Sequence, residues 1–341
     1  ALGDAGANDA EVARVALKYG DAFPIAYMSR YRAKQAVFDI EKLEQAEKSG
    51  ALGLDLYRLN DDGDRQLRLK FYNPDKPLDL SDVLPILENM DLRAISELPF
   101  EIKPAGSERT IWIQDFLLET PSAATAAAAA EAKAGFEQAF GKIWYKDVEN
   151  DGLNRLVLRG GLDYRRVTIL RTYVRYLRQI GSPFGRAYIE DALVQNPSIA
   201  QALADMFVAI HDPAQTKERA ALIKNLTGDI TYKLEKVESL DQDRILRAIV
   251  NLIDCTVRTN FFQHGPDGQP KTYLSVKLDS ARVNDMPEPK PFREIFVYSP
   301  RMEGVHLRSD KIARGGIRWS DRHEDFRTEI LGLVKAQQVK N

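Results

Sequence analysis

The chain has 341 residues, and its 48 lysines and arginines against 50 aspartates and glutamates give a formal net charge of −2 at pH 7. With 44% hydrophobic and 29% charged residues, it has the composition of a globular chain of about two or three domains. The near-neutral charge argues against a general nucleic-acid-binding protein, because such proteins usually carry a basic excess.

The first part of the chain changes from a helical to a strand period. Residues 9–47 carry apolar side chains at positions i, i+3 and i+4, which predicts an N-terminal helical segment over residues 1–50. Residues 52–59 and 66–73 instead alternate apolar and polar side chains, as half-buried strands do. Between them, Asp61-Asp62-Gly63-Asp64 has the chemistry of a hairpin turn.

From residue 66 the predicted order is strand, helix, strand, strand, helix, which is part of the ferredoxin-like pattern. The later members are a short helix near Ser81, strands over 92–103 and 109–119, and an alanine-rich helix over 122–147. Alanine has the highest helix propensity, and Phe136 and Phe140 belong to an apolar stripe on that helix. The sequence therefore predicts one α/β module over residues 51–147.

The second half is predicted to be a helical bundle followed by strands. The helical period dominates residues 148–264, up to a last helix over 241–262, and Arg171 is interpreted as lying on the solvated side of one helix. The strand period returns within residues 265–341, and a final helix over 321–341 reaches the chain end without a Gly or Pro stop signal. We expect an α+β, helix-rich fold and a chain that is part of a longer protein.

The sequence argues against a membrane span, a signal peptide, a disulfide and a metal site. No stretch approaches the roughly 18 uninterrupted apolar residues of a membrane span, and the first residues lack the basic start and apolar run of a signal peptide. Cys255 is the only cysteine, so an intramolecular disulfide is excluded; we expect a buried thiol and a cytoplasmic protein. Four dispersed histidines offer no zinc-site spacing, so no metal site is predicted.

The densest group of cations surrounds two glycines between Arg308 and Arg322, in RSDKIARGGIRWSDR. Gly315 and Gly316 allow the backbone to present N–H groups, and a guanidinium such as that of Arg314 binds a carboxylate or phosphate with two hydrogen bonds. The pattern indicates an anion site, although a Gly-Gly hairpin with solvated arginines explains the same residues. Because no G-x-G-x-x-G or P-loop pattern accompanies it, a phosphate-binding role is weakly supported.

A resemblance to a known family lies in the stretch from Ala313 to Asn341, ARGGIRWSDRHEDFRTEILGLVKAQQVKN. It resembles the opening of the catalytic region of the large bacterial NAD-dependent glutamate dehydrogenases, and EIFVYSPRMEGVHLR before it is similar to the same family. Weaker similarity extends back through KFYNPDKPLDLSDVLPILENMDLRAISELPFEI. The resemblance implies an ACT-like regulatory module over 51–147, a helical bundle over 148–264 and the truncated start of the substrate-binding domain over 265–341.

The resemblance also implies roles for single residues. In that family a basic residue before a Gly-Gly-Ile/Leu-Arg motif binds the side-chain carboxylate of the substrate, and the lysine of a later Lys-Asn pair binds the α-carboxylate. The matching residues here are Arg314 and Lys340, with Gly315 and Gly316 shaping the turn and Arg318 supporting it. The family's catalytic lysine, catalytic aspartate and NAD-binding domain come after these motifs and have no counterpart here, so the isolated chain is expected to be inactive.

The implied parent enzyme is a cytoplasmic homo-oligomer without nucleic-acid or membrane partners, which converts L-glutamate, NAD and water to 2-oxoglutarate, ammonia and NADH. An ACT-like module further implies an effector site for an amino acid at Asn73, Ser81 and Asp82, where a helix N-terminus would face a carboxylate; a module used only for packing is the simpler interpretation. The alternative function is a non-enzymatic amino-acid-sensing or oligomerisation module. That alternative leaves the motif around Arg314 unexplained.

Overall fold

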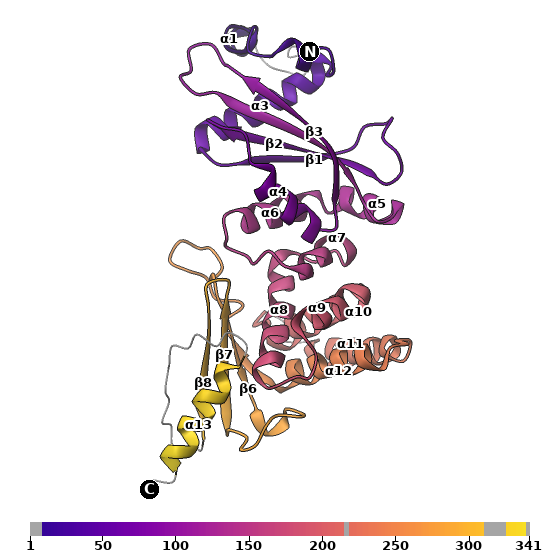
Figure 1. The fold of residues 1–341 in the computed structure, drawn as a ribbon, viewed down its shortest axis with the longest axis vertical. Coiled ribbons are helices and arrows are strands. Elements are labelled where there is room, and N and C mark those ends of the chain that lie inside the picture. The colour runs from indigo at the N-terminus through magenta and orange to yellow at the C-terminus, as the bar shows by residue number, and fades with distance from the viewer. Residues whose placement is uncertain (1–8, 215–217, 310–324, 339–341) are drawn as a thin grey trace. The chain divides into compact units, whose positions relative to one another are not determined.

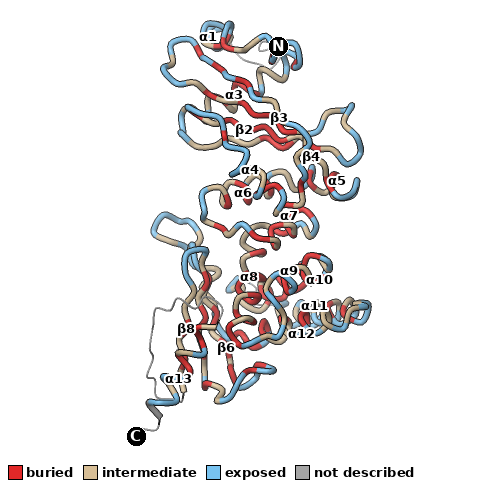
Figure 2. Tube along the Cα trace, viewed as in Figure 1, coloured by how far each residue is buried: buried red, intermediate tan, exposed pale blue. Residues whose placement is uncertain are grey.

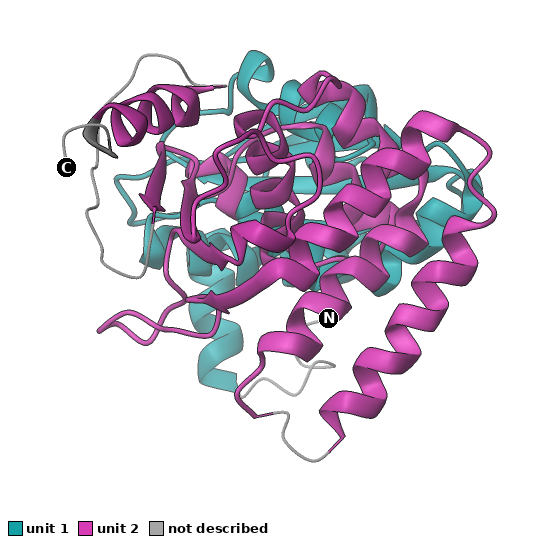
Figure 3. Ribbon diagram, turned by 90° about the horizontal axis from the view of Figure 1, so that it is seen from below, with its two compact units in different colours: residues 1–141 teal, residues 142–341 magenta. Residues whose placement is uncertain are grey.

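A computed structural model describes residues 9–214, 218–309 and 325–338 of the protein. The chain forms two compact units, residues 1–141 and residues 142–341 (Figure 3). Among the residues that the structure describes, no helix is long and apolar enough to cross a membrane.

The first unit is built on one antiparallel sheet with the strand order β1-β2-β4-β3 (Figure 1). Its elements, including the helix that leads out of it, are α1 (Asp9–Tyr19), α2 (Ile25–Met28), α3 (Ala33–Ser49), β1 (Gly53–Tyr57), β2 (Gln66–Pro74), α4 (Leu80–Asn89), β3 (Arg93–Ile102), β4 (Ile111–Glu119), α5 (Ala123–Glu131) and α6 (Lys133–Trp144). The order strand, helix, strand, strand, helix from β2 onward agrees with the prediction. β1 occupies the place beside β2 that the final strand takes in a complete ferredoxin-like fold.

Strand β2 is buried on both faces because helices cover both sides of the sheet (Figure 2). Successive side chains of a strand point to opposite faces. Phe71 packs against Phe140 of α6, with ring centroids 5.1 Å apart. Lys70 lies on the opposite face and donates to Asp39 of α3 at 2.7 Å. The prediction of a half-buried strand is therefore corrected: β2 is a central strand, and its polar side chains alternate with apolar ones because one face makes a buried polar contact.

The buried Lys70–Asp39 pair fixes α3 against the sheet. Both side chains are almost fully excluded from solvent, at 3% and 1% exposed. Tyr72 donates to Asp39 at 2.6 Å, Tyr27 donates to the same carboxylate, and the Lys70 ammonium lies 4.1 Å from the ring centre of Tyr31. A buried carboxylate needs such donors because desolvation disfavours its charge.

The predicted single helix over residues 122–147 is wrong, because the structure has two helices, α5 and α6, separated at Ala132. The reason lies in the sequence of α5, which is almost entirely alanine and has no apolar stripe to fix its direction. The stripe begins at Phe136, which is fully buried and packs beside Phe140. Packing of Phe136 and Phe140 therefore sets the axis of α6, whereas α5 is held by the small buried side chains of Ala126 and Ala129.

The second unit combines a helical bundle with a second antiparallel sheet, of strand order β5-β6-β7-β8. Its described elements are η2 (Gly152–Arg155), α7 (Leu156–Arg159), α8 (Tyr164–Gln179), α9 (Arg186–Gln195), α10 (Pro197–His211), α11 (Arg219–Leu234), α12 (Leu240–Cys255), β5 (Thr256–Thr259), β6 (Leu274–Leu278), η3 (Ser280–Arg282), β7 (Arg293–Ser299), β8 (Met302–Arg308) and α13 (Phe326–Gln338). Helix α8 lies against β6 and β7, and α13 lies against β8 (Figure 1). Tyr176 of α8 and Phe296 of β7 meet in the core, with ring centroids 5.3 Å apart.

The predicted helix over residues 241–262 is corrected by the structure, because α12 ends at Cys255 and β5 follows directly. Thr256 pairs with Leu278 of β6, so the sheet satisfies the backbone groups that a longer helix would have used. The β-branched side chains of Thr256 and Val257 also favour a strand. Cys255 is buried, as the sequence predicted.

Candidate functional site

The residues that the sequence assigns to glutamate lie outside the described part of the chain. Arg314, Gly315, Gly316 and Arg318 fall within residues 310–324, and Lys340 falls within 339–341. Their roles stay predictions. The structure does describe the two elements that flank them, β8 before the glycine pair and α13 after it.

Helix α13 is anchored through its second residue, Arg327. Its Nε and Nη2 atoms donate to the two carboxylate oxygens of Glu294 on β7, each at 2.8 Å. The two side chains are 1% and 0% exposed. Burial acts against the charged guanidinium, but the hydrogen bonds that it donates to Glu294 outweigh burial and raise the pKa of Arg327. The pair therefore holds the start of α13 on the sheet.

The anchor of α13 continues into the helical bundle through Gln179 at the end of α8. Its Oε1 accepts from the backbone N–H of Arg327 at 3.2 Å, and its Nε2 donates to Glu303 of β8 at 3.1 Å. The Nε of Arg175, one turn earlier on α8, lies 3.6 Å from Glu303. Helix α8 thus contacts both β8 and α13 through polar side chains.

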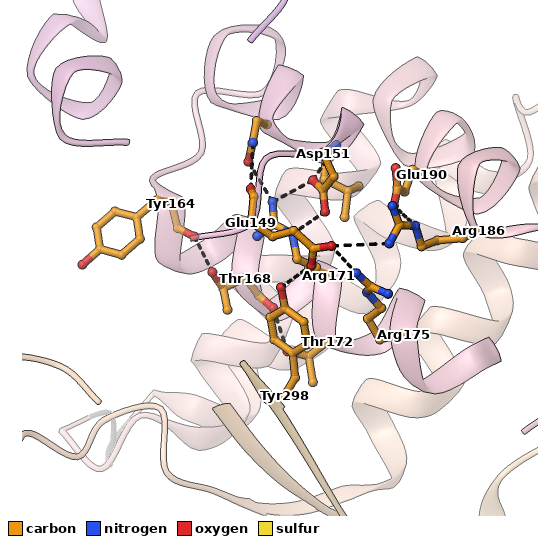
Figure 4. A network of polar contacts seen from close by, with 12 residues as sticks. Glu149, Asp151, Tyr164, Thr168, Arg171, Thr172, Arg175, Arg186, Glu190 and Tyr298 are labelled. Carbon is orange, nitrogen blue, oxygen red and sulfur yellow. Dashed lines mark hydrogen bonds and ion pairs between the residues drawn. The ribbon is translucent and has the colours of Figure 1, made fainter. Parts of the chain in front are cut away.

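A second polar cluster surrounds Arg171 in the middle of α8 (Figure 4). Arg171 donates through Nε and Nη2 to both oxygens of Asp151, at 2.6 and 2.8 Å, and through Nη2 to Asn154 at 2.7 Å. It is only 1% exposed, so the interpretation of Arg171 as a solvated arginine is wrong. Asp151 comes just before η2, and its carboxylate compensates the charge that a buried guanidinium carries.

Glu149 and Glu190 complete this cluster (Figure 4). Glu149 accepts from the Tyr298 hydroxyl at 2.7 Å and from Arg175, and the Arg186 Nη1 lies 3.4 Å away. Burial, together with the negative charge of Asp151, raises the pKa of Glu190 to about 7, although Arg186 at 3.1 Å opposes the shift. Glu190 therefore titrates near neutral pH. No sequence pattern predicted this role of Glu190, because its burial depends on how α9 packs on η2.

The predicted effector residues lie at the end of β2 and the start of α4 in the first unit. The Asn73 side-chain amide donates to the backbone carbonyl of Lys76 at 2.8 Å, so it stabilises the turn. Ser81 and Asp82 are exposed in the first turn of α4, after Asp79 at the N-cap. Asp82 already places a negative charge near the positive end of the helix dipole. An effector carboxylate would compete with that charge, and the effector site stays a prediction.

A metal centre is not found among the residues that the structure describes. Within the described ranges, no group of three or more His, Cys, Asp or Glu side chains is placed to hold a metal ion. The titratable side chains that do gather, around Arg171 and Arg327, are paired as ion pairs of opposite charge.

Comparison with family models gives four matches in chain order. They are "Glutamate dehydrogenase, helical motif 2" at residues 5–46, "Glutamate dehydrogenase, ACT3 domain" at 51–132, "Glutamate dehydrogenase, helical motif 3" at 148–213 and "Bacterial NAD-glutamate dehydrogenase, catalytic domain" at 229–341. The catalytic-domain match covers β5 to α13 and the predicted glutamate residues between β8 and the chain end.

Curated relatives carry the name NAD-specific glutamate dehydrogenase. The protein from Halomonas elongata is 43% identical over 95% of this chain, that from Pseudomonas aeruginosa 42% over 98%, and that from Mycobacterium tuberculosis 38% over 96%. The chain spans 20 to 21% of the length of these relatives.

The matches define a modular dehydrogenase segment, in which helical and ACT modules precede the start of a catalytic domain. The chain belongs to the family of NAD-specific glutamate dehydrogenases. The resemblance predicted from the sequence is confirmed, and the non-enzymatic sensing module is not favoured.

Proposed function

We propose that this chain is an internal part of an enzyme that oxidises L-glutamate with NAD and water to 2-oxoglutarate, ammonia and NADH. The observation that carries the proposal is the match of residues 229–341 to the catalytic-domain model of the bacterial NAD-glutamate dehydrogenases. The motif around Arg314 falls inside that match.

In this proposal the chain supplies the residues that bind the two carboxylates of the substrate. Arg314 binds the side-chain carboxylate and Lys340 binds the α-carboxylate, while Gly315 and Gly316 bring backbone N–H groups close and Arg318 supports the turn. Fixing both carboxylates determines where the Cα–H bond points, which is the positioning that hydride transfer requires. The Arg327–Glu294 pair supports this role, because it holds the helix between Arg314 and Lys340.

NAD has no counterpart among the residues of this chain. The sequence contains no G-x-G-x-x-G pattern, so the residues present do not fit a dinucleotide, and we assign none of them to NAD. We propose that the cofactor, the catalytic lysine and the catalytic aspartate belong to the remainder of the enzyme. We further propose that the enzyme is a homo-oligomer and that it is cytoplasmic. The single buried Cys255 supports the second point alone, because a chain with one cysteine needs no oxidising compartment.

The proposal is tested by comparing the whole enzyme with this chain under the same conditions. Glutamate-dependent formation of NADH is expected from the whole enzyme and not from the 341-residue chain. Absence of activity in a folded whole enzyme would contradict the proposal.

The role of Arg314 is tested by Arg314→Ala in the whole enzyme. We expect the KM for glutamate to rise roughly 30-fold or more, since a bidentate charged contact is lost. The KM for NAD should stay nearly constant. Arg258→Ala, on the exposed face of β5, is the matched control and should leave both constants unchanged. Equal loss of glutamate and NAD binding in Arg314→Ala would remove the assigned role.

A further inference from the structure

A small cavity of about 70 Å³ lies in the second unit beside the polar cluster of Figure 4. Its wall comes from the start of α8, the loop before β6 and the end of β7. The lining residues that bear on its chemistry are Glu149, Tyr164, Arg165, Arg171, Lys271 and Tyr298.

One buried donor on this wall has no acceptor. Arg171 uses Nε and Nη2 on Asp151 and Asn154, but its Nη1 is buried and has no hydrogen-bond partner among the described residues. Leaving a buried N–H unsatisfied costs the full desolvation penalty of that group, so native proteins almost always supply an acceptor. The unfilled donor therefore points to a bound group in or beside the cavity.

The cavity also has an excess of positive charge. Its two carboxylates are already engaged, Asp147 by Lys142 at 3.1 Å and Glu149 by Arg175. By contrast, no described carboxylate lies within ion-pair distance of Arg165 or Lys271. Arg165 and Lys271, which are both partly exposed, thus have no carboxylate partner among the described residues.

The Arg165 guanidinium is held in place although it has no carboxylate. It lies over the ring of Phe261, 4.2 Å from the ring centre, and donates to the Phe261 backbone carbonyl. This contact fixes the charge at the cavity wall before any ligand arrives, which lowers the entropy cost of binding. Tyr164 and Tyr273 add aromatic surface to the same wall, which suits a carbon skeleton better than an inorganic ion.

We propose that this cavity binds a small organic dicarboxylate, with Arg165 and Lys271 each taking one carboxylate and Arg171 supplying the buried donor. The proposal assigns the contacts to residues other than the predicted glutamate residues, and it does not depend on the proposed dehydrogenase activity. The cavity lies where the first half of α8 meets the sheet of the catalytic-domain match, and the last residue of the same helix, Gln179, contacts α13.

The test is calorimetric titration of the folded 341-residue chain with succinate and, separately, with inorganic phosphate at constant ionic strength. We expect succinate to bind, and Lys271→Glu and Arg165→Met each to weaken it by about tenfold or more, because each removes one charged contact. Lys277→Glu, on β6 but outside the cavity wall, makes the same change in net charge and should stay within about twofold of the unaltered chain.

Arg314→Ala separates this site from the predicted glutamate site, and succinate binding should survive it. The proposal is overturned if succinate does not bind the folded chain, which would leave the cavity to water. It is equally overturned if binding is lost in Arg314→Ala, if Lys277→Glu weakens it as much as Lys271→Glu, or if phosphate binds as tightly as succinate. Circular dichroism of each variant confirms that the fold is kept, and Lys271→Glu alone decides the matter should Arg165→Met fail to fold.

Discussion

Charged side chains inside the two units act as specific anchors between elements. Lys70 with Asp39 joins α3 to the sheet of the first unit, while Arg171 with Asp151 joins α8 to η2 in the second. A buried ion pair contributes little net stability compared with apolar side chains of the same volume, but the loss of one partner leaves an uncompensated charge. Their value is therefore in fixing which elements meet.

Glu190 is the residue for which we expect a measurable dependence of stability on pH. Its pKa is raised to about 7 in the folded chain from the ordinary value of 4.5. Because the folded state holds the proton more tightly, the contribution of Glu190 to stability is present below about pH 4.5 and is lost as the pH rises through about 7.

Glu190→Gln keeps an uncharged side chain at every pH. We expect the free energy of unfolding of this variant to rise relative to that of the unaltered chain as the pH increases from about 5 to about 8. The rise should reach up to about 3 kcal/mol. Urea denaturation across that range measures the difference. Glu238→Gln, at an exposed position, is the control and should give a curve parallel to that of the unaltered chain. A parallel curve for Glu190→Gln as well would refute the shifted pKa.

At the scale of elements, the contacts of Arg327 in its first turn hold α13 in place. Its first turn is held by Glu294 from β7 and Gln179 from α8, so three elements meet at Arg327. These contacts fix where the first turn of α13 sits on the sheet. If Lys340 binds substrate, its placement depends on this anchor.

Arg327→Met in the whole enzyme should therefore raise the KM for glutamate by roughly tenfold while changing the KM for NAD little. It should also lower stability by about 3–5 kcal/mol, because Glu294 is left buried without a partner. Arg327→Lys keeps the charge and should recover part of both losses. Steady-state kinetics and chemical denaturation give the two readouts.

The matched control for Arg327→Met is Arg293→Met. Arg293 lies on β7 beside Glu294, and its substitution breaks a partly exposed ion pair with Asp279. Surface pairs of this kind contribute at most about 1 kcal/mol, so its effect should be small. A fall in kcat alone, with the KM for glutamate unchanged, would argue that Arg327 does not position the substrate residues.

At the scale of the whole molecule, the chain consists of two units that each have a core (Figure 3). The described cores follow the predicted change of period: alternating strands in the first unit, helices and then strands in the second. Units with separate cores can in principle fold alone, so we expect two unfolding transitions.

Reciprocal substitutions test that expectation. Lys70→Met removes a buried charge of the first unit, and Arg171→Met removes one of the second. Each should lower one calorimetric transition by an amount equivalent to about 3–5 kcal/mol and leave the other in place. Hydrogen exchange assigns each transition to residues 9–141 or to residues 142–309. A single transition that both substitutions shift equally would show that the chain unfolds as one cooperative unit.

The sequence alone determined the order of most elements, the family and the motif around Arg314, because period, turn residues and short motifs are local properties of the chain. Only the tertiary structure decided that the helix before Thr256 ends at Cys255, and that Arg171, Lys70 and Arg327 are buried ion-pair anchors. The physical reason is that the local sequence around a charged residue is the same whether its side chain faces water or a buried partner. Which of the two it faces depends on contacts with residues distant in the chain, such as Glu294 for Arg327, and these form only when the elements pack.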